Sequence, residues 1–495
     1  MARSRIGSVG VLALLALLAL RSTLPAQAGA DPAERSPNVL VLLVDDLRPD
    51  ALGAAGNPYA RTPNLDAFAE DSARFENTYC FGSVHGAVCQ PSRAMILSGR
   101  TLWRTDLSLR GMPTLPEHLR RRGYDTFATG KWHNGRESFE RLFGEGHAAQ
   151  VMLGGMSNHE AVPVRQLGEN GQLGEQSTGE KFSSELFADA TVDFLQRQGE
   201  SGSPFFAWVA FTAPHDPRQP PKEFRAMFRG DDRPPLPPNF LPQHPFDNGR
   251  LIVRDEVLAG WPRDPEVVRD QLGEYYGLIA HMDVQIGRIL EALEEQGLKD
   301  DTIVVFAADH GLAMGSHGLL GKQNLYEHSM GAPMWFRGPG VVPGARDELA
   351  YLHDISATVC DHLGFPRLPG DEGRDLALDL GPAAPPRRSL FTTYENKIRA
   401  VRNERFKLIR YPLAGLEQLF DLRRDPHEIV DLSDDPQYAE VATALRAELL
   451  EWQDRVGDPH PAFLDGATVE RPDLSGRERK PDRWQPDWIV EKYFR

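Results

Sequence analysis

Residues 89 to 93 read CQPSR and place a proline and an arginine at short, fixed distances after a cysteine. At an average usage of about 5% per residue type, Pro, Ser and Arg would fall at set offsets from a given cysteine roughly once in ten thousand cases. Chance is therefore a poor explanation for this pattern. The pattern therefore favours a functional role for Cys89 and Arg93 over that of a buried structural cysteine.

Acidic side chains and one histidine come directly after two apolar runs. Asp45 and Asp46 end the run VLVLLVDD, and Asp309 and His310 end the run VVFAADH. Such runs are typical of buried parallel strands, and ligands bind at the carboxyl ends of these strands. Carboxylate oxygens that converge there suit a divalent, oxygen-preferring cation, although the nitrogen of a histidine also suits zinc or manganese.

Basic side chains occupy similar positions elsewhere in the chain. Lys131 and His133 lie in TGKWHNG, and His215 lies in FTAPHDPRQPP, in each case after a further apolar run. Lys322 lies in LLGKQNLYEHS. Ammonium groups can offset charge that develops on an oxyanion, and histidines can transfer protons. We predict that these four residues join the acidic residues in one site.

The order of the predicted elements indicates an α/β fold. Apolar runs alternate with helical patterns, such as the apolar positions at helical spacing in residues 272–293, which end before Gly297. This alternation predicts a large, mostly parallel sheet sandwiched by helices in residues 36–380. A linker candidate at 381–389 precedes a smaller C-terminal domain, residues 386–495, for which we predict an antiparallel sheet and a helix.

The first 28 residues resemble a secretory signal peptide. Two arginines precede an apolar run at residues 9–20, and the small residues of AQA at 26–28 follow it, so we predict cleavage after Ala28. The run is far shorter than the ~20 apolar residues that a membrane-spanning helix needs. We therefore expect an exported protein, periplasmic or extracellular, without stable membrane insertion.

Composition limits the partners of the chain. The formal net charge of −16 argues against a nucleic-acid-binding protein, so an anionic substrate must be attracted by a local basic pocket. Three cysteines are too few for a disulfide scaffold. Cys80 and Cys360 either form one bridge or remain buried thiols. The oligomeric state is not predicted by any of these features.

The pattern Cys89-x-Pro91-Ser92-Arg93, continued by LSGR at 97–100, resembles the signature of the type I sulfatases of the alkaline phosphatase superfamily. The resemblance extends over residues 38–432, and its details are most similar to the branch that includes iduronate-2-sulfatase. It implies hydrolysis of sulfate monoesters, with a sulfated small molecule or saccharide as substrate. It also implies that a formylglycine-generating enzyme recognises Pro91 and Arg93 and oxidises Cys89 to formylglycine.

The resemblance further implies a role for each candidate residue. It implies one calcium ion per chain, held by Asp45, Asp46, residue 89, Asp309 and His310. It implies that Lys131 and Lys322 bind the sulfate group, that Arg93 holds the formylglycine hydrate, that His133 deprotonates this hydrate, and that His215 protonates the leaving alcohol. A thiol that attacked sulfur would be trapped as an adduct, whereas a hydrate has a second hydroxyl with which to expel sulfate.

Two other functions fit parts of the same pattern. Related enzymes with the cysteine motif and the Asp-His metal pair hydrolyse phosphonate monoesters or phosphodiesters, and a product assay separates this alternative from a sulfatase. A catalytically silent glycan-binding relative would have lost part of the constellation, but every expected position is intact. An alkaline phosphatase would need a serine or threonine nucleophile.

Several residues near the motifs have less certain roles. We predict that His317 and Glu327 organise the loop that carries Lys322. For Asp216 and Arg218 there are two alternatives, that they reach the substrate or that they do not, and the sequence favours neither. Substrate choice is predicted to depend on residues 134–180, on the Pro-rich residues 216–265, which we expect to form a long surface excursion near the site, and on the C-terminal domain.

Overall fold

The computed structural model describes residues 36–155, 159–381, 385–477, 487 and 490–491. The predicted signal peptide lies outside these described residues. Within the part of the chain that is described, no helix combines the length and the apolar character needed to cross a membrane.

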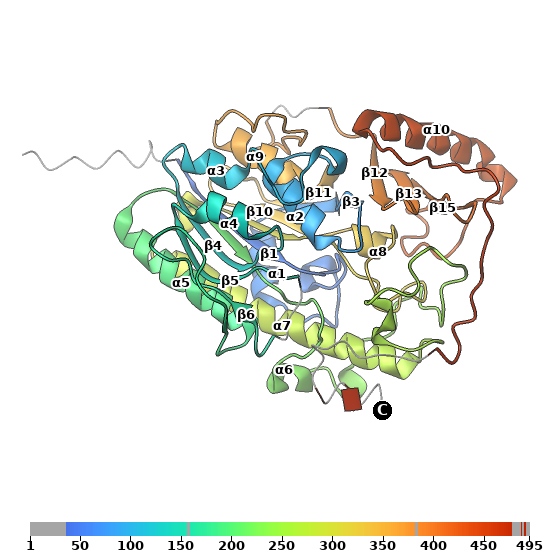
Figure 1. The fold of residues 1–495 in the computed structure, drawn as a ribbon, viewed down its shortest axis with the longest axis horizontal. Coiled ribbons are helices and arrows are strands. Elements are labelled where there is room, and N and C mark those ends of the chain that lie inside the picture. Colours follow the sequence, from blue (N-terminus) through green and yellow to red (C-terminus); the bar gives the residue numbers. More distant parts are fainter. Residues whose placement is uncertain (1–35, 156–158, 382–384, 478–486, 488–489, 492–495) are drawn as a thin grey trace, which may run out of the picture. The chain divides into compact units, whose positions relative to one another are not determined.

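The main sheet has eight strands, and only one of them is antiparallel to its neighbours (Figure 1). In spatial order the strands are β11 (Gly344–Tyr351), β2 (Ala73–Tyr79), β10 (Met334–Arg337), β9 (Thr302–Ala308), β1 (Asn38–Val44), β8 (Phe205–Ala210), β4 (Asp125–Lys131) and β5 (His147–Met152). The antiparallel strand is β10. Strand β1 is central and wholly buried, with β9 and β8 parallel to it on either side, which explains its continuous apolar sequence.

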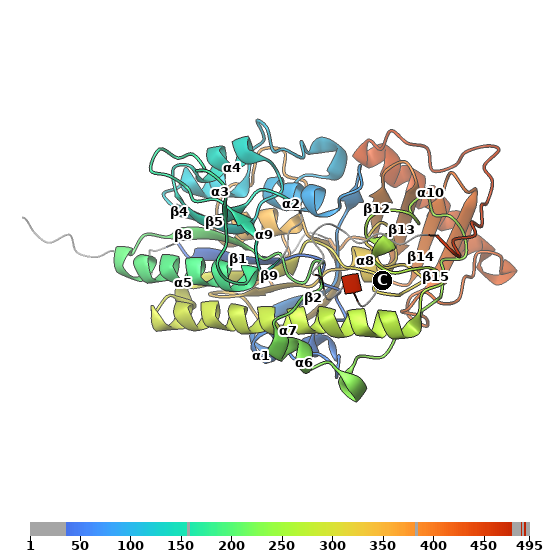
Figure 2. The same ribbon diagram turned by 60° about the horizontal axis from the view of Figure 1, so that its bottom comes forward.

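Helices cover the two faces of this sheet. Figure 2 shows α5 and α7 on one side of the strands and α2, α3 and α4 on the other. The helices of this part of the chain are α1 (Pro63–Glu70), α2 (Cys89–Ser98), α3 (Leu115–Arg120), α4 (Arg136–Phe143), α5 (Ser183–Ser201), α6 (Lys222–Ala226), α7 (Pro265–Glu295), α8 (Glu327–Met330) and α9 (Asp354–His362). The long helix α7 begins where the side chain of Asp264 accepts a hydrogen bond from the backbone N–H of Glu266, and it ends just before Gly297.

A second sheet has five strands near the C-terminal end of the chain. Its order is β15 (Leu416–Asp421), β14 (Phe406–Tyr411), β13 (Ile398–Asn403), β12 (Ser389–Tyr394) and β3 (Gly82–Ser83). The helix α10 (Ala439–Val456) contacts β13 and β14 (Figure 1). A third, two-stranded sheet pairs β6 (Pro163–Val164) with β7 (Ser177–Thr178).

The predicted fold class is confirmed by these two large sheets and their helices. The described residues from 37 onward form one compact unit, and β3, which lies shortly before Cys89 in the sequence, pairs with β12 of the C-terminal sheet. The division into domains at 36–380 and 386–495 remains a prediction.

All three cysteines are buried and unpaired, so the structure contains no bridge between Cys80 and Cys360. Burial raises the pKa of each of these two thiols to about 12. Both are therefore inert, protonated thiols near neutral pH.

Candidate active site

The carboxyl ends of four adjacent strands bring most of the predicted residues together. Asp45 and Asp46 follow β1, Asp309 and His310 follow β9, Lys131 is the last residue of β4, and His215 lies in the loop after β8. All six side chains are buried. Strand order thus explains why residues far apart in the sequence meet at one edge of the sheet.

Cys89 is the first residue of α2 and lies beside this cluster. Its Sγ atom is 3.3 Å from Nε2 of His310 and 3.7 Å from Nζ of Lys322. The hydroxyl of Ser92, one turn further along α2, donates a hydrogen bond of 2.6 Å to the backbone carbonyl of Asp309. This bond fixes the start of α2 against the end of β9.

Arg93 joins three of the strand ends through its guanidinium group. Nε donates to Oδ2 of Asp309 at 3.0 Å, Nη2 lies 3.4 Å from Oδ2 of Asp45, and Nη1 donates to the backbone carbonyl of Lys131 at 2.6 Å. Because Arg93 is fully buried, these contacts hold a fixed positive charge beside residue 89.

Two lysines place ammonium groups on the acidic pair after β1. Lys131 forms an ion pair with Asp45, and Nζ of Lys322 donates to Oδ1 of Asp46 at 2.7 Å. Burial opposes ionisation of Asp45, but the positive charges of Lys131, Arg93 and Lys322 outweigh it and hold the pKa of Asp45 well below its usual range. The site therefore presents three fixed cations to an anionic group.

Four ligand atoms in this site lie close enough together to hold a metal ion. Asp45, Asp46, Cys89 and His310 each offer an atom within 4.8 Å of the others. Oδ1 of Asp45 and Oδ2 of Asp46 are buried without a hydrogen-bond partner, which is costly unless a cation or a ligand satisfies them. The donor set thus fits a divalent cation. Asp309 lies outside this group of four, since its carboxylate binds Arg93 and accepts the backbone N–H of Asp46 at 3.3 Å.

His310 is oriented for metal binding. Nδ1 lies 2.9 Å from the backbone carbonyl of Gly311, which leaves Nε2 facing Asp46 at 3.5 Å and the sulfur of Cys89. Without a cation, burial favours the neutral ring, but the neighbouring carboxylates of Asp309 and Asp46 outweigh it and raise the pKa of His310 to about 10. The site thus favours positive charge where a metal would lie.

The two other histidines differ in their surroundings. Nδ1 of His215 lies 2.7 Å from the backbone carbonyl of Asp216, and Nε2 lies 3.7 Å from Oδ2 of Asp46, so Nε2 faces the cluster. His133 is partly exposed, and burial together with Lys131 and Arg93 lowers its pKa to about 2. His133 is therefore neutral at physiological pH, because burial and the neighbouring cations disfavour its protonated form.

The backbone is unusual at two of these positions. Asp46 has a φ of 66° and His133 a φ of 70°, in the left-handed region that residues other than glycine adopt rarely. Tyr275 of α7 stabilises the first of them, because its hydroxyl donates to the backbone carbonyl of Asp46 at 2.7 Å. Such backbone strain concentrates at functional sites.

The residues with less certain roles have defined contacts. His317 stacks on Tyr326 with ring centroids 3.8 Å apart, and Nζ of Lys407 lies 2.9 Å from Oε1 of Glu327. Their role as organisers of the Lys322 loop remains a prediction. Nη1 of Arg218 donates to Oε1 of Gln271 at 2.6 Å.

Three buried or half-buried residues at the site had not been predicted to be functional. Nε2 of His159 lies 2.8 Å from the backbone carbonyl of His215. Arg254 and Asp255 contact the residues beside His215 and Lys322, respectively. None of the three lies in a recognisable motif. For Arg254 and Asp255, the one indication in the sequence was that the Pro-rich excursion was predicted to lie near the site. The excursion itself is less superficial than predicted, since Asp216, Arg218, Asp255, Glu256 and Arg263 are all buried.

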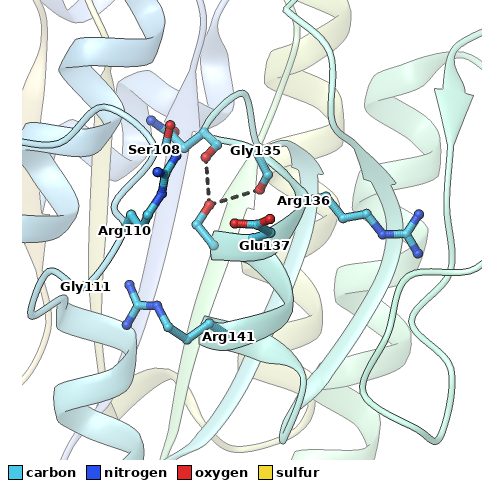
Figure 3. Close-up of a pocket in the computed structure, with 9 residues that line it drawn as sticks. Ser108, Arg110, Gly111, Gly135, Arg136, Glu137 and Arg141 are labelled. Atoms are coloured by element: carbon cyan, nitrogen blue, oxygen red, sulfur yellow. Dashed lines mark hydrogen bonds between the residues drawn. The ribbon is translucent and has the colours of Figure 1, made fainter.

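A cavity of about 450 Å³ lies next to the segment that follows His133. It is lined by Ser108, Arg110, Gly111, Asn134, Gly135, Arg136, Glu137, Ser138 and Arg141. Figure 3 shows Arg110 and Glu137 on facing walls, with Arg136 turned away. Nδ2 of Asn134 donates to the backbone carbonyl of Gln90 at 3.0 Å, so one wall of the cavity is connected to the residue after Cys89.

Comparison with known proteins identifies the family. A family model described as Sulfatase matches residues 37–365, and one described as N-sulphoglucosamine sulphohydrolase, C-terminal, matches residues 315–455. The chain therefore belongs to the sulfatase family. This confirms the predicted family and the predicted enzyme class, a sulfuric ester hydrolase.

Similar sequences and structures agree with this assignment. An arylsulfatase from Clostridium perfringens is 28% identical over 472 residues, which cover 84% of this chain and 94% of that protein. Human iduronate 2-sulfatase is 29% identical over 343 residues, covering 61% of this chain and 60% of that protein.

Two solved structures have the same fold. A protein in complex with its substrate D-glucosamine-2-N,6-O-disulfate has a TM-score of 0.70 and 20% identity, over 87% of this chain and 99% of that chain. The phosphonate monoester hydrolase of Agrobacterium radiobacter has a TM-score of 0.67 and 23% identity, over 88% of this chain and 100% of that chain.

Proposed function

We propose that this protein is an exported, calcium-dependent sulfatase that hydrolyses sulfate monoesters of saccharides through a formylglycine made from Cys89. The observation that carries the proposal is the position of Cys89, whose buried sulfur lies 3.3 Å from His310 and 3.7 Å from Lys322 at the edge of the sheet. The modification requires a formylglycine-generating enzyme as a partner during maturation.

The fixed cations bind the sulfate group. Lys131 and Lys322 contact the sulfuryl oxygens and stabilise the negative charge that develops on them, while Arg93 orients residue 89. Asp45, Asp46, His310 and residue 89, with the predicted ligand Asp309 beside them, would hold one calcium ion per chain, and this ion would supply further positive charge to the sulfate group.

The two histidines transfer protons in different steps of the proposed reaction. Addition of water to the formylglycine aldehyde would give a hydrate, of which one hydroxyl would attack sulfur as the ester bond to the alcohol breaks. Deprotonation of the second hydroxyl would then break the carbon–oxygen bond to sulfate and return the aldehyde. His215 gives a proton to the alcohol oxygen as the sulfur–oxygen ester bond breaks. His133 is the residue proposed to take the proton of the second hydroxyl.

A saccharide is the proposed substrate class, for two reasons. A similar structure contains a disulfated glucosamine as its substrate. In addition, the cavity in Figure 3 has charged and polar walls that suit the hydroxyl and sulfate groups of a sugar, and it includes residues of the segment predicted to determine substrate choice. Export remains a proposal that is based on the signal-like sequence of residues 1–28.

A phosphonate monoester or phosphodiester hydrolase is the second candidate. It is favoured by one observation, the shared fold of the Agrobacterium radiobacter enzyme. Release of inorganic sulfate from a panel of sulfated saccharides by the fully modified protein tests the first proposal. Turnover of a phosphonate monoester with no sulfate release from any member of the panel would favour the second.

A further inference from the structure

The proposed proton donor and one proposed sulfate-binding lysine contact the same carboxylate. Nε2 of His215 lies 3.7 Å from Oδ2 of Asp46, and Nζ of Lys322 lies 2.7 Å from Oδ1. Each of these two side chains also contacts a second buried carboxylate on its other side. Asp216 lies beside His215, with 3.5 Å between Oδ1 and Nδ1, and Asp255 lies beside Lys322, with 4.0 Å between Oδ2 and Nζ.

Arg254 joins these two outer carboxylates. Its Nη1 atom donates to Oδ1 of Asp216 at 2.8 Å and to Oδ1 of Asp255 at 3.0 Å, and its Nη2 atom contacts Oδ2 of Asp216. The pair with Asp216 is therefore bidentate, a geometry that fixes the orientation of both partners. Gln323 completes the contacts on the other side, because its Nε2 atom donates to Oδ2 of Asp255 at 2.9 Å.

Charge explains why an arginine is needed at this position. Asp216 and Asp255 are both buried and negatively charged, and without a cation between them they would repel each other. Each would then be held only by its remaining partners, which include His215 and Lys322. The Arg254 side chain is 30% exposed, so it enters the site from the surface of the Pro-rich excursion.

We infer that Arg254 is a positioning residue. Through its contacts with Asp216 and Asp255, it holds His215 and Lys322 in fixed positions relative to each other. The inference rests on the proposed function, because it assigns Arg254 to the placement of the proton donor and of one sulfate-binding group. It also gives the excursion a role in the reaction that is separate from substrate choice.

The test is the kinetics of Arg254→Gln on aryl sulfates whose leaving phenols differ in acidity. A misplaced His215 slows esters of weakly acidic phenols most, since these need a proton on the departing oxygen, and we expect a loss in kcat of about tenfold or more for them and a smaller loss for nitrophenyl sulfate. A misplaced Lys322 adds a loss in kcat of similar size throughout the series, on top of this dependence on the leaving group. Arg254→Lys, which keeps the charge but loses the bidentate contact, should recover part of the loss.

Arg250→Gln is the matched control. Arg250 lies in the same excursion and also forms a paired contact with a carboxylate, that of Glu395, at 3.1 Å from Nε to Oε2. It should leave the dependence on the leaving group unchanged. An equal loss across the whole series in Arg254→Gln, or the same loss in Arg250→Gln, overturns the inference.

Two further measurements separate this inference from the proposed function. If the wild-type protein releases sulfate neither from the aryl sulfates nor from the panel of sulfated saccharides, the proposed function fails. A crystal structure of Arg254→Gln then decides the inference alone: the His215 ring and Lys322 Nζ should be displaced, and unchanged positions overturn it. If Arg254→Gln does not fold, Asp216→Asn removes the bidentate pair while keeping the side-chain shape, with the same leaving-group dependence expected.

Discussion

The sulfur of Cys89 and Nε2 of His310 lie 3.3 Å apart although the two residues are 221 positions apart in the sequence. The contact joins the first residue of α2 to the end of β9. It places the residue proposed to become the nucleophile directly beside a proposed metal ligand. The modified side chain and the proposed metal site are therefore neighbours.

Replacing Lys322 should affect the reaction itself. Lys322→Ala removes one of the cations next to residue 89, and loss of one such contact in the transition state lowers kcat by about a hundredfold. Steady-state kinetics with an aryl sulfate measure it, with Lys299→Ala, an exposed lysine, as the control. A rise in KM with kcat unchanged would mean that Lys322 binds substrate and transition state equally.

Removing a carboxylate should remove the metal. Asp45→Asn keeps the shape of the side chain but lowers the negative charge around the ion, so we expect loss of about one calcium per chain, measured by elemental analysis. Asp283→Asn changes another buried carboxylate, which accepts the backbone N–H of Leu65 at 2.8 Å, and should retain calcium. Stoichiometric zinc without calcium in the wild type would contradict the choice of metal.

The site should prefer sulfate to phosphorus esters. A sulfate monoester carries one negative charge and a phosphate monoester about two near neutral pH, so the three cations and the metal can bind either in the ground state. Because the chain belongs to the sulfatase family and the proposed nucleophile is a hydrate, we predict a higher kcat/KM for an aryl sulfate than for the matching phosphate or phosphonate. Faster turnover of the phosphonate would favour the second candidate function.

Acid should destabilise the fold through buried histidines. Burial lowers the pKa of His353 from 6.5 to about 4, so between these pH values the unfolded chain binds a proton that the folded chain does not. The free energy of unfolding therefore falls as pH falls through this range. His353→Gln should reduce the slope by up to about 1.4 kcal/mol per pH unit in denaturant titrations. The exposed His147→Gln is the control, and an unchanged slope in His353→Gln would contradict the assignment.

Much of the central architecture follows from local sequence patterns. The apolar runs 38–44 and 302–308 coincide with β1 and β9, and the spacing in 272–293 lies within α7. The helix predicted within residues 386–495 is α10. These elements were predictable because a buried strand or a one-sided helix imposes its own period on the sequence.

The contacts between distant loops were not predictable in the same way. β3 has only two residues and joins a sheet formed by residues about 300 positions later, for which no local pattern exists. Arg254 and Asp255 lie in a segment whose charges and prolines indicated a surface excursion near the site, but not which of its residues contact the residues beside His215 and Lys322. Their position beside His215 and Lys322 depends on how the whole excursion folds back, which is a property of tertiary packing.

The most direct test of the account is the chemical state of residue 89 in active protein. Mass spectrometry of the peptide that contains it should show loss of the thiol and gain of an aldehyde or its hydrate. Cys89→Ala should abolish turnover with the fold intact by circular dichroism, whereas Cys360→Ala, at another buried thiol, should retain activity. Unmodified cysteine at position 89 in a fully active sample would contradict the proposed mechanism.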